Sequence, residues 1–85
     1  MARTLTISRT TVPLNERSRY FERLALRKSH YEAANCRFWV FEEVALPGAF
    51  IEFTEASDAN ILSEAHANAP HRILDAARIY KEVEL

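Results

Sequence analysis

Several residue types are scarce in this 85-residue sequence, which contains one glycine, one cysteine and three prolines. Glycine-rich loops that wrap phosphates or dinucleotides need several glycines at fixed spacing, so Gly48 alone excludes a Walker loop and a Rossmann pattern. A nucleophile elbow is excluded for the same reason. Because Cys36 stands alone in an apolar run, it cannot close an intramolecular disulfide, and we expect a buried thiol in a reducing compartment.

The sequence also lacks an excess of charge and a long apolar run. Its 11 Lys and Arg against 12 Asp and Glu leave a net charge of -1, so we expect no nucleic acid partner. No run approaches the roughly 18 apolar residues of a spanning helix, and the N-terminus has no apolar segment typical of a signal peptide. We therefore expect a cytoplasmic protein with no membrane partner, folded as one domain over residues 1–85.

Hydrophobic periodicity predicts six elements in the order βαββαβ. A helix begins at Asn15 as N-cap and runs to residue 34, and a second begins at Ser57-Asp58 and ends before Pro70. The segment 71–77 has no clear period, although Ile73 and Leu74 have buried character. The expected strands cover residues 4–12, 36–44, 49–55 and 78–85. This order predicts an α+β, ferredoxin-like fold, with a four-stranded antiparallel sheet and both helices on one face.

The hairpin between the second and third strands determines which side chains share a face. Pro47 and Gly48 suit the two central positions of a tight turn. If Leu46 opposes Ala49, then Glu43 pairs with Glu52, whereas a three-residue loop would reverse the faces. The first register places these side chains beneath the helices: Phe38, Val40, Val44, Ile51 and Phe53. It places these on the opposite face: Arg37, Trp39, Phe41, Glu43, Phe50, Glu52, Thr54 and, from the last strand, Tyr80.

An open face with so many aromatic side chains would be an unusually large exposed apolar patch in a monomer. Two sheets packed face to face would bury it. We therefore expect a homodimer in which two sheets form a closed or nearly closed barrel. The first helix would turn its polar side, with Arg19, Glu22, Arg23 and Arg27, to solvent.

Three stretches carry a resemblance to a known family: the aromatic strand Cys36-Arg-Phe-Trp-Val-Phe-Glu-Glu, the Pro47-Gly48 hairpin with the strand after it, and the segment from Ser57-Asp58 to Ala65-His-Ala-Asn-Ala-Pro-His71. In these the chain resembles the dimeric α/β-barrel superfamily, and within it the small proteins similar to antibiotic biosynthesis monooxygenases. The resemblance implies dimerisation through the sheets and a small, often aromatic, molecule held between sheet and helices.

The resemblance also implies two kinds of activity. Some members oxygenate quinol-type substrates with O2 and without a prosthetic group, and others degrade haem. The haem-degrading members carry an Asn on the first strand, where this sequence has Thr4, Thr6, Ser8 and Thr10. No cofactor is therefore expected.

Four residues are candidates for catalysis. Glu43 and Glu52, opposed in the predicted register, would raise one another's proton affinity as an acid/base site requires, or would pair with arginines of the partner. His66 has an intrinsic pKa suited to proton transfer. Arg37 could stabilise a developing oxyanion, or serve in a structural ion pair.

Candidate ligand-binding residues come from the open face. Trp39 could stack on a flat ligand, Tyr80 could donate to an enolate oxygen, and Arg9 could bind an anionic oxygen. Phe41 and Phe50 complete the predicted pocket. For each aromatic residue, filling the dimer interface is the alternative. His66 and His71 are five residues apart and do not share a helix face, and Glu64 and Asp75 are only loosely placed as a third ligand, so no metal site is expected.

Two functions from different classes fit this pattern. The first is a homodimer that binds a small hydrophobic or aromatic molecule, as a monooxygenase-like enzyme or without catalysis. The second is a non-catalytic dimerisation or interaction module whose aromatic face serves only assembly. The sequence leaves open whether the chain is an enzyme, and it does not identify a substrate.

Overall fold

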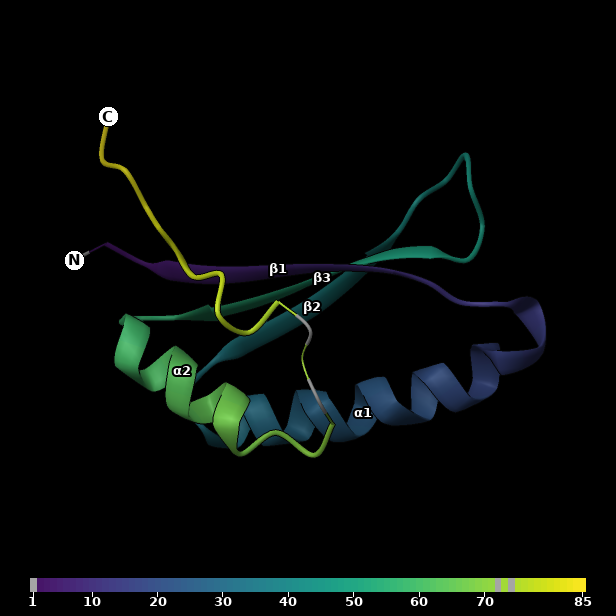
Figure 1. The fold of residues 1–85 in the computed structure, drawn as a ribbon, viewed down its shortest axis with the longest axis horizontal. Helices are drawn as coiled ribbons and strands as arrows, with labels where there is room; N and C mark the ends of the chain where they lie inside the picture. The colour runs from purple at the N-terminus through teal and green to yellow at the C-terminus, as the bar shows by residue number, and fades with distance from the viewer. Residues whose placement is uncertain (1, 72, 74) are drawn as a thin grey trace.

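The computed structural model describes residues 2–71, 73 and 75–85 (Figure 1). A four-stranded antiparallel sheet has the strand order β2-β3-β1-β4, and both helices lie on one side of it (Figure 1). The elements are β1 (Thr4–Thr11), the 3-10 turn η1 (Leu14–Glu16), α1 (Arg17–Ala33), β2 (Arg37–Glu42), β3 (Ala49–Ala56), α2 (Ala59–Ala67) and β4 (Tyr80–Lys81). The predicted ferredoxin-like α+β fold is confirmed at the level of element order and sheet topology.

The long helix α1 begins one residue later than the sequence predicted. Pro13 fixes the chain before η1, and Glu16 then stands at the N-cap without a side-chain hydrogen bond, so the prediction of Asn15 as N-cap is wrong. The C-terminal end forms a Schellman motif, in which Cys36 N donates to Tyr31 O and Asn35 adopts a φ of 63°. Asn tolerates this left-handed conformation, which turns the chain into β2.

The shorter helix α2 begins where it was predicted. Asp58 is the N-cap, and its side chain accepts a hydrogen bond from Ile61 N at 2.8 Å. Leu62 and Ala65 are buried against the sheet. One aspartate thus fixes the start of the helix that carries His66.

The β2–β3 hairpin contains the predicted tight turn, but its register is shifted. Gly48 has a φ of 96° at the second central position after Pro47. A further turn at Glu43 to Leu46 precedes it, so the ladder closes between Glu43 and Ala49 and the tight turn lies beyond its end. Phe41, and not Val44, therefore faces Ile51.

A register shift by an odd number of residues reverses the face of one strand. The side chains of β2 keep their predicted faces, with Phe38 and Val40 toward the helices. Those of β3 exchange faces. Toward the helices lie Phe50, Glu52 and Thr54, and away from them lie Ile51, Phe53 and Glu55. The predicted pairing of Glu43 with Glu52 is wrong, because Val40 lies opposite Glu52.

The last strand is shorter than residues 78–85. β4 contains Tyr80 and Lys81, and one further backbone hydrogen bond runs from Glu82 N to Arg3 O. Leu74, which was predicted to be buried, lies outside the described residues. In the part of the chain that the structure describes, no helix combines the length and apolar character needed to cross a bilayer.

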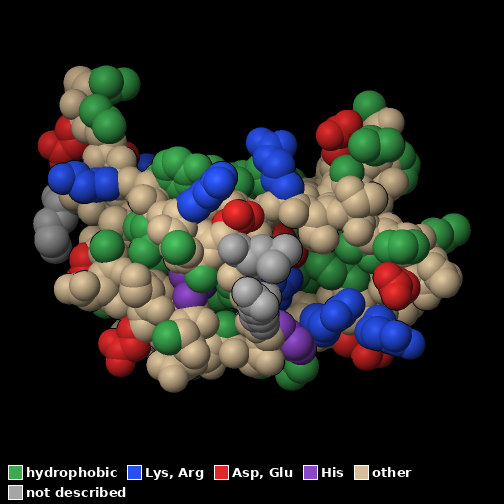
Figure 2. All heavy atoms as spheres, in the orientation of Figure 1, with side chains coloured by type: hydrophobic (Ala, Val, Ile, Leu, Met, Phe, Trp, Pro, Cys, Tyr) green, Lys and Arg blue, Asp and Glu red, His purple; other side chains and the backbone are tan. Residues whose placement is uncertain are grey.

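The hairpin loop and the C-terminal segment both rise from the sheet on the side opposite the helices (Figure 1). Figure 2 shows two raised ends, each with hydrophobic and acidic side chains, and a lower region between them. We call the side of the sheet under the helices the closed face and the other side the open face.

Candidate functional site

The closed face is unusually polar for the interior of a small domain. Burying a polar group costs free energy unless it is hydrogen-bonded, so each such group needs a partner. These polar residues are buried there: Thr4, Thr6, Arg27, Glu52, Thr54 and His66. Their partners define two clusters, one around Glu52 and one around His66.

The first cluster joins Glu52 of β3 to Tyr20 and Arg27 of α1. The Tyr20 hydroxyl donates to Glu52 Oε2 at 2.7 Å, and Arg27 Nη1 lies 2.8 Å from Glu52 Oε1. Because seven residues make about two helical turns, Tyr20 and Arg27 project from the same face of α1. The Arg27 guanidinium also lies over the Phe38 ring, 5.5 Å from its centroid. Burial and the bond to Glu52 raise the pKa of Tyr20, so its phenol remains a donor.

Beside this cluster lies a cavity of about 270 Å³, which we call the helix-side cavity. It opens between β1, α1 and the chain around His71. Among the described residues, two buried side-chain nitrogens lack a hydrogen-bond partner, Arg27 Nε and His71 Nδ1. Both residues line this cavity. Its lining consists of Ser8, Arg9, Thr10, Thr11, Val12, Glu16, Tyr20, Arg23, Arg27, Glu52, His71 and Ile73.

The second cluster engages both ring nitrogens of His66. Nδ1 shares a hydrogen bond of 2.7 Å with the Tyr31 hydroxyl, and Nε2 shares one of 2.9 Å with Thr6 Oγ1. Burial, and then the charge of His30, lower the pKa of His66, and burial raises the pKa of Tyr31 to about 12. His66 therefore ties α2 to α1 and β1, and its predicted part in proton transfer stays a prediction.

The open face carries the aromatic side chains of β2 and β3. Trp39 stacks on Phe53 with ring centroids 5.5 Å apart, and Phe41 meets the same ring edge-on at 5.7 Å. Phe41 is 57% exposed and Tyr80 is 52% exposed. Such a patch is large for a domain of this size.

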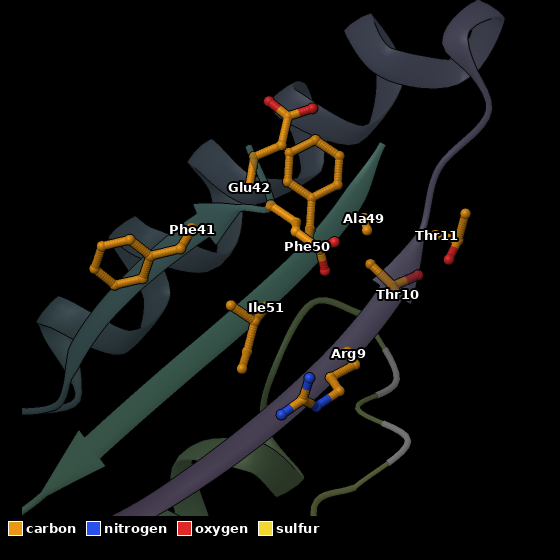
Figure 3. Close-up of a pocket in the computed structure, with 9 residues that line it drawn as sticks. Arg9, Thr10, Thr11, Phe41, Glu42, Ala49, Phe50 and Ile51 are labelled. Carbon is orange, nitrogen blue, oxygen red and sulfur yellow. The ribbon is translucent and has the colours of Figure 1, made fainter. Parts of the chain in front are cut away.

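Two hollows divide the predicted aromatic pocket. The first, of about 470 Å³, is bordered by Phe41 and Phe50 (Figure 3), and the second, of about 340 Å³, by Trp39 and Tyr80. Phe50 itself is only 4% exposed, and its side chain points toward α1 (Figure 3). The register shift moves it to the closed face, so the four aromatic residues do not line one pocket.

The predicted polar residues are also separated. Glu43 is exposed near the hairpin, whereas Glu52 is buried in the Tyr20–Arg27 cluster. Arg37 is exposed, and its Nη1 lies 3.8 Å from Glu55 Oε1. Arg37 pairs with Glu55 in the ladder, and both lie on the open face, whereas Glu52 lies on the closed face. Arg9 borders both the first hollow and the helix-side cavity.

Most residues of the helix-side cavity were not predicted as site residues from the sequence, among them Ser8, Tyr20 and Arg27. Arg27 was assigned to solvent, but it is buried in the interior. The signal was present, because Arg27 continues the stripe of Tyr20, Leu24 and Tyr31 at helical spacing. An arginine on an apolar stripe needs a buried carboxylate opposite it, and β3 provides Glu52.

Within residues 2–71, 73 and 75–85, no group of three His, Cys, Asp or Glu side chains lies close enough to hold a metal ion. No family model and no curated protein matches the sequence. The fold is similar to that of Rv0793 from Mycobacterium tuberculosis, with a TM-score of 0.70 over 100% of this chain and 96% of that one. Since only 16% of the aligned residues are identical, the likeness establishes a shared ferredoxin-like fold and nothing about activity.

Proposed function

We propose that this protein is a homodimeric α/β barrel that binds a small molecule in the helix-side cavity. The observation that carries the proposal is the coincidence of the two unpartnered buried nitrogens, Arg27 Nε and His71 Nδ1, with one cavity of about 270 Å³. A ligand with oxygen or nitrogen atoms would provide partners for both.

The buried ion pair supports a ligand site. A pair such as Arg27–Glu52 often gives no more stability than apolar residues of the same volume, so its presence next to an open volume needs another reason. Small-molecule sites combine a cavity with a few convergent polar groups. The cavity beside Glu52, Tyr20 and Arg27 has both properties.

The homodimer is supported by the open face. Trp39, Phe41, Phe53 and Tyr80 would be buried by a second sheet.

A catalytic form of the proposal follows from the resemblance to antibiotic biosynthesis monooxygenases. In it, a quinol-type substrate gives up a proton in the cavity before O2 oxidises it. His71, Glu16 and Glu52 are the groups of the lining that could accept this proton. Oxygen uptake with small quinols as substrates tests this form, and a rate unchanged in His71→Ala would remove His71 from the mechanism.

Ligand binding is tested by titrating ¹⁵N-labelled protein with phenol, benzamide and benzoate. We expect shift changes at the amides of Ser8, Tyr20 and His71. Ser8→Phe should fill the cavity and abolish these changes, whereas Ser63→Phe on the exposed side of α2 should leave them intact. Changes confined to Trp39 and Tyr80 would instead put the ligand on the open face and contradict the proposed site.

Assembly is tested by sedimentation velocity at micromolar concentration. The unmodified chain should sediment as a dimer, and Trp39→Glu as a folded monomer, because a buried carboxylate without a partner opposes association. Arg19→Glu, on the exposed side of α1, is the matched control and should remain dimeric. A monomeric unmodified chain would refute the homodimer but leave the cavity to be tested.

The second candidate function is a non-catalytic dimerisation module. The exposed aromatic cluster of the open face favours it, because that surface needs no ligand to explain it. The two candidates separate cleanly: a dimer that binds none of the three small molecules supports the module, and a dimer that binds one of them in the helix-side cavity supports the first proposal.

A further inference from the structure

We infer that the ligand of the helix-side cavity carries an oxyanionic group, a carboxylate or a phosphate, and that Arg27 is the residue that binds it. This inference rests on the proposed function, and it adds the chemical class of the ligand. It differs from the hydrophobic or aromatic ligand that the sequence predicts, because it makes charge the property that the cavity selects.

The guanidinium of Arg27 has one buried nitrogen, Nε, without a hydrogen-bond acceptor in the described part of the chain. Its Nη1 is paired with Glu52 at 2.8 Å, while Nε is buried and has no partner among the described residues. The residue is only 8% exposed, so water reaches little of it. A guanidinium presents its N–H groups as a planar fork that matches two oxygens of a carboxylate or phosphate. Arg27 lines the cavity, so its guanidinium is the group there to which an anionic oxygen would bind.

The guanidinium of Arg27 is held in place before a ligand binds. Glu52 holds one side of the guanidinium, and the Phe38 ring lies 5.5 Å beneath it. An arginine that is already oriented loses less side-chain entropy when it binds a ligand. The buried pair thus positions the guanidinium before a ligand binds.

The cavity lining contains other charged side chains besides Arg27. Arg9 and Arg23 also line the cavity, against the carboxylates of Glu16 and Glu52. The charge of Glu52 is already met by two donors, Tyr20 and Arg27, which reduces its repulsion of an anion. Arg23 lies one turn before Arg27 on α1, so both cations can face one ligand.

The size and polarity of the cavity also constrain the ligand. At about 30 Å³ for each water molecule, 270 Å³ corresponds to roughly nine waters, which suits a monocyclic or short acyclic compound. Val12 and Ile73 are the aliphatic members of the lining, and Ser8, Thr10, Thr11 and Tyr20 bear hydroxyls. This lining suits hydrogen-bonding groups better than a wide hydrophobic ring system.

The experiment compares three probes that share a phenyl ring: benzoate, phenyl phosphate and the neutral benzamide. Binding is followed by calorimetry and by the amide shifts of Ser8, Tyr20 and His71. We expect benzoate or phenyl phosphate to bind at least about tenfold more tightly than benzamide, since a charge-assisted fork adds more than 1.4 kcal/mol. The tighter of the two anions tells a carboxylate ligand from a phosphate ligand.

Two variants connect any preference to arginine. Arg27→Lys keeps the charge but removes the fork, and should reduce the preference for the anion about tenfold. If this variant unfolds, Arg23→Gln changes an exposed residue and should still weaken anion binding severalfold. Arg19→Gln, on the same helix but outside the cavity, should leave both affinities unchanged.

The outcomes separate the inference from the function on which it rests. If benzamide binds in the cavity as tightly as the anions, the proposed function stands and the oxyanion inference is wrong. If Arg27→Lys is folded and keeps the full preference, Arg27 is not the binding group and the inference is again wrong. If none of the probes binds, the proposed site fails as well.

Discussion

The two faces of this sheet differ in the side chains that accompany their apolar residues, because the closed face adds buried polar groups to the hydrophobic core of Tyr31, Phe38, Phe50 and Leu62. The face covered by the protein's own helices contains a buried ion pair, three buried threonines and a buried histidine. The uncovered face contains Trp39, Phe41 and Phe53 in mutual contact. Burial of the open-face aromatic residues would contribute more to stability than a satisfied polar group does, so their exposure has a cost in a monomer.

The difference fits the proposal that the two faces bind different partners, a small molecule on one and a second sheet on the other. Polar groups at the closed face are paired with one another and border a cavity, as expected for a surface that meets a small molecule. Aromatic groups at the open face contact one another across neighbouring strands, as expected for a surface that meets another sheet. Successive side chains of β3 point alternately to the closed face and the open face, so a single substitution can change one face and leave the other intact.

The largest expected effect comes from Glu52 on the closed face. Glu52→Ala removes one member of the buried pair and leaves Arg27 charged without its partner, which should lower the free energy of unfolding by about 3–5 kcal/mol. Urea denaturation followed by circular dichroism measures it. Glu43→Ala, at an exposed position, is the matched control and should change stability by less than about 0.5 kcal/mol. Equal effects for the two glutamates would contradict the closed-face assignment.

The next effect comes from Phe53, the neighbour of Glu52 on the opposite face. Phe53→Ala should weaken dimerisation by about 2 kcal/mol, or roughly thirtyfold in the dissociation constant, because it removes the ring that contacts both Trp39 and Phe41. Sedimentation equilibrium measures this constant. Val44→Ala, at a hairpin position that is 98% exposed, should leave it unchanged. A dimer unaffected by Phe53→Ala would mean that the open face is not the interface.

The sequence was sufficient to predict the architecture because local signals agreed with one another. Alternation in residues 4–12, the helix start at Ser57-Asp58 and the Pro47-Gly48 turn each appear in the structure where they were predicted. The faces of β2 were also predicted. Each of these signals depends on only a few consecutive residues, so it can be interpreted without knowledge of long-range contacts.

The site was harder to predict, because it depends on the hairpin register. An extra turn at Glu43 to Leu46 displaces the ladder, and no short-range signal distinguished that loop from a two-residue hairpin. The displacement moved Glu52 and Phe50 to the closed face and took Glu52 away from Glu43. Arg27 was missed for a related reason: its burial is favourable only because Glu52 lies opposite it, a contact between distant segments.

A smaller effect is expected at Gly48, in the loop that joins the two strands. Its φ of 96° is unfavourable for other residues, and a Cβ there would lie 2.8 Å from Val12 O. Gly48→Ala should therefore lower the free energy of unfolding by about 1–2 kcal/mol. Thermal unfolding measures this. Leu46→Ala, at an exposed position of the same loop, should have little effect, and a neutral Gly48→Ala would show that the loop can relax.

The smallest effect is a pH dependence of the closed face, and it should be absent from the open face, which has no histidine among its described residues. Burial lowers the pKa of His66 below its ordinary value of about 6.5, so the unfolded chain binds a proton more readily than the folded one. The contribution of His66 to stability is therefore complete above pH 6.5 and is lost as the pH falls through the lowered pKa.

His66→Gln tests this dependence, because glutamine keeps a hydrogen-bonding side chain near Tyr31 and Thr6 but does not titrate. Urea denaturation at pH 7.5 and pH 5.0 should show a smaller loss of stability for the variant than for the unmodified chain. His30→Gln is the comparison, since His30 Nε2 is bound to Ala65 O at the edge of the interior. If His66→Gln retains the full pH dependence, then proton uptake on unfolding occurs elsewhere, and the polar interior owes its pH response to other groups.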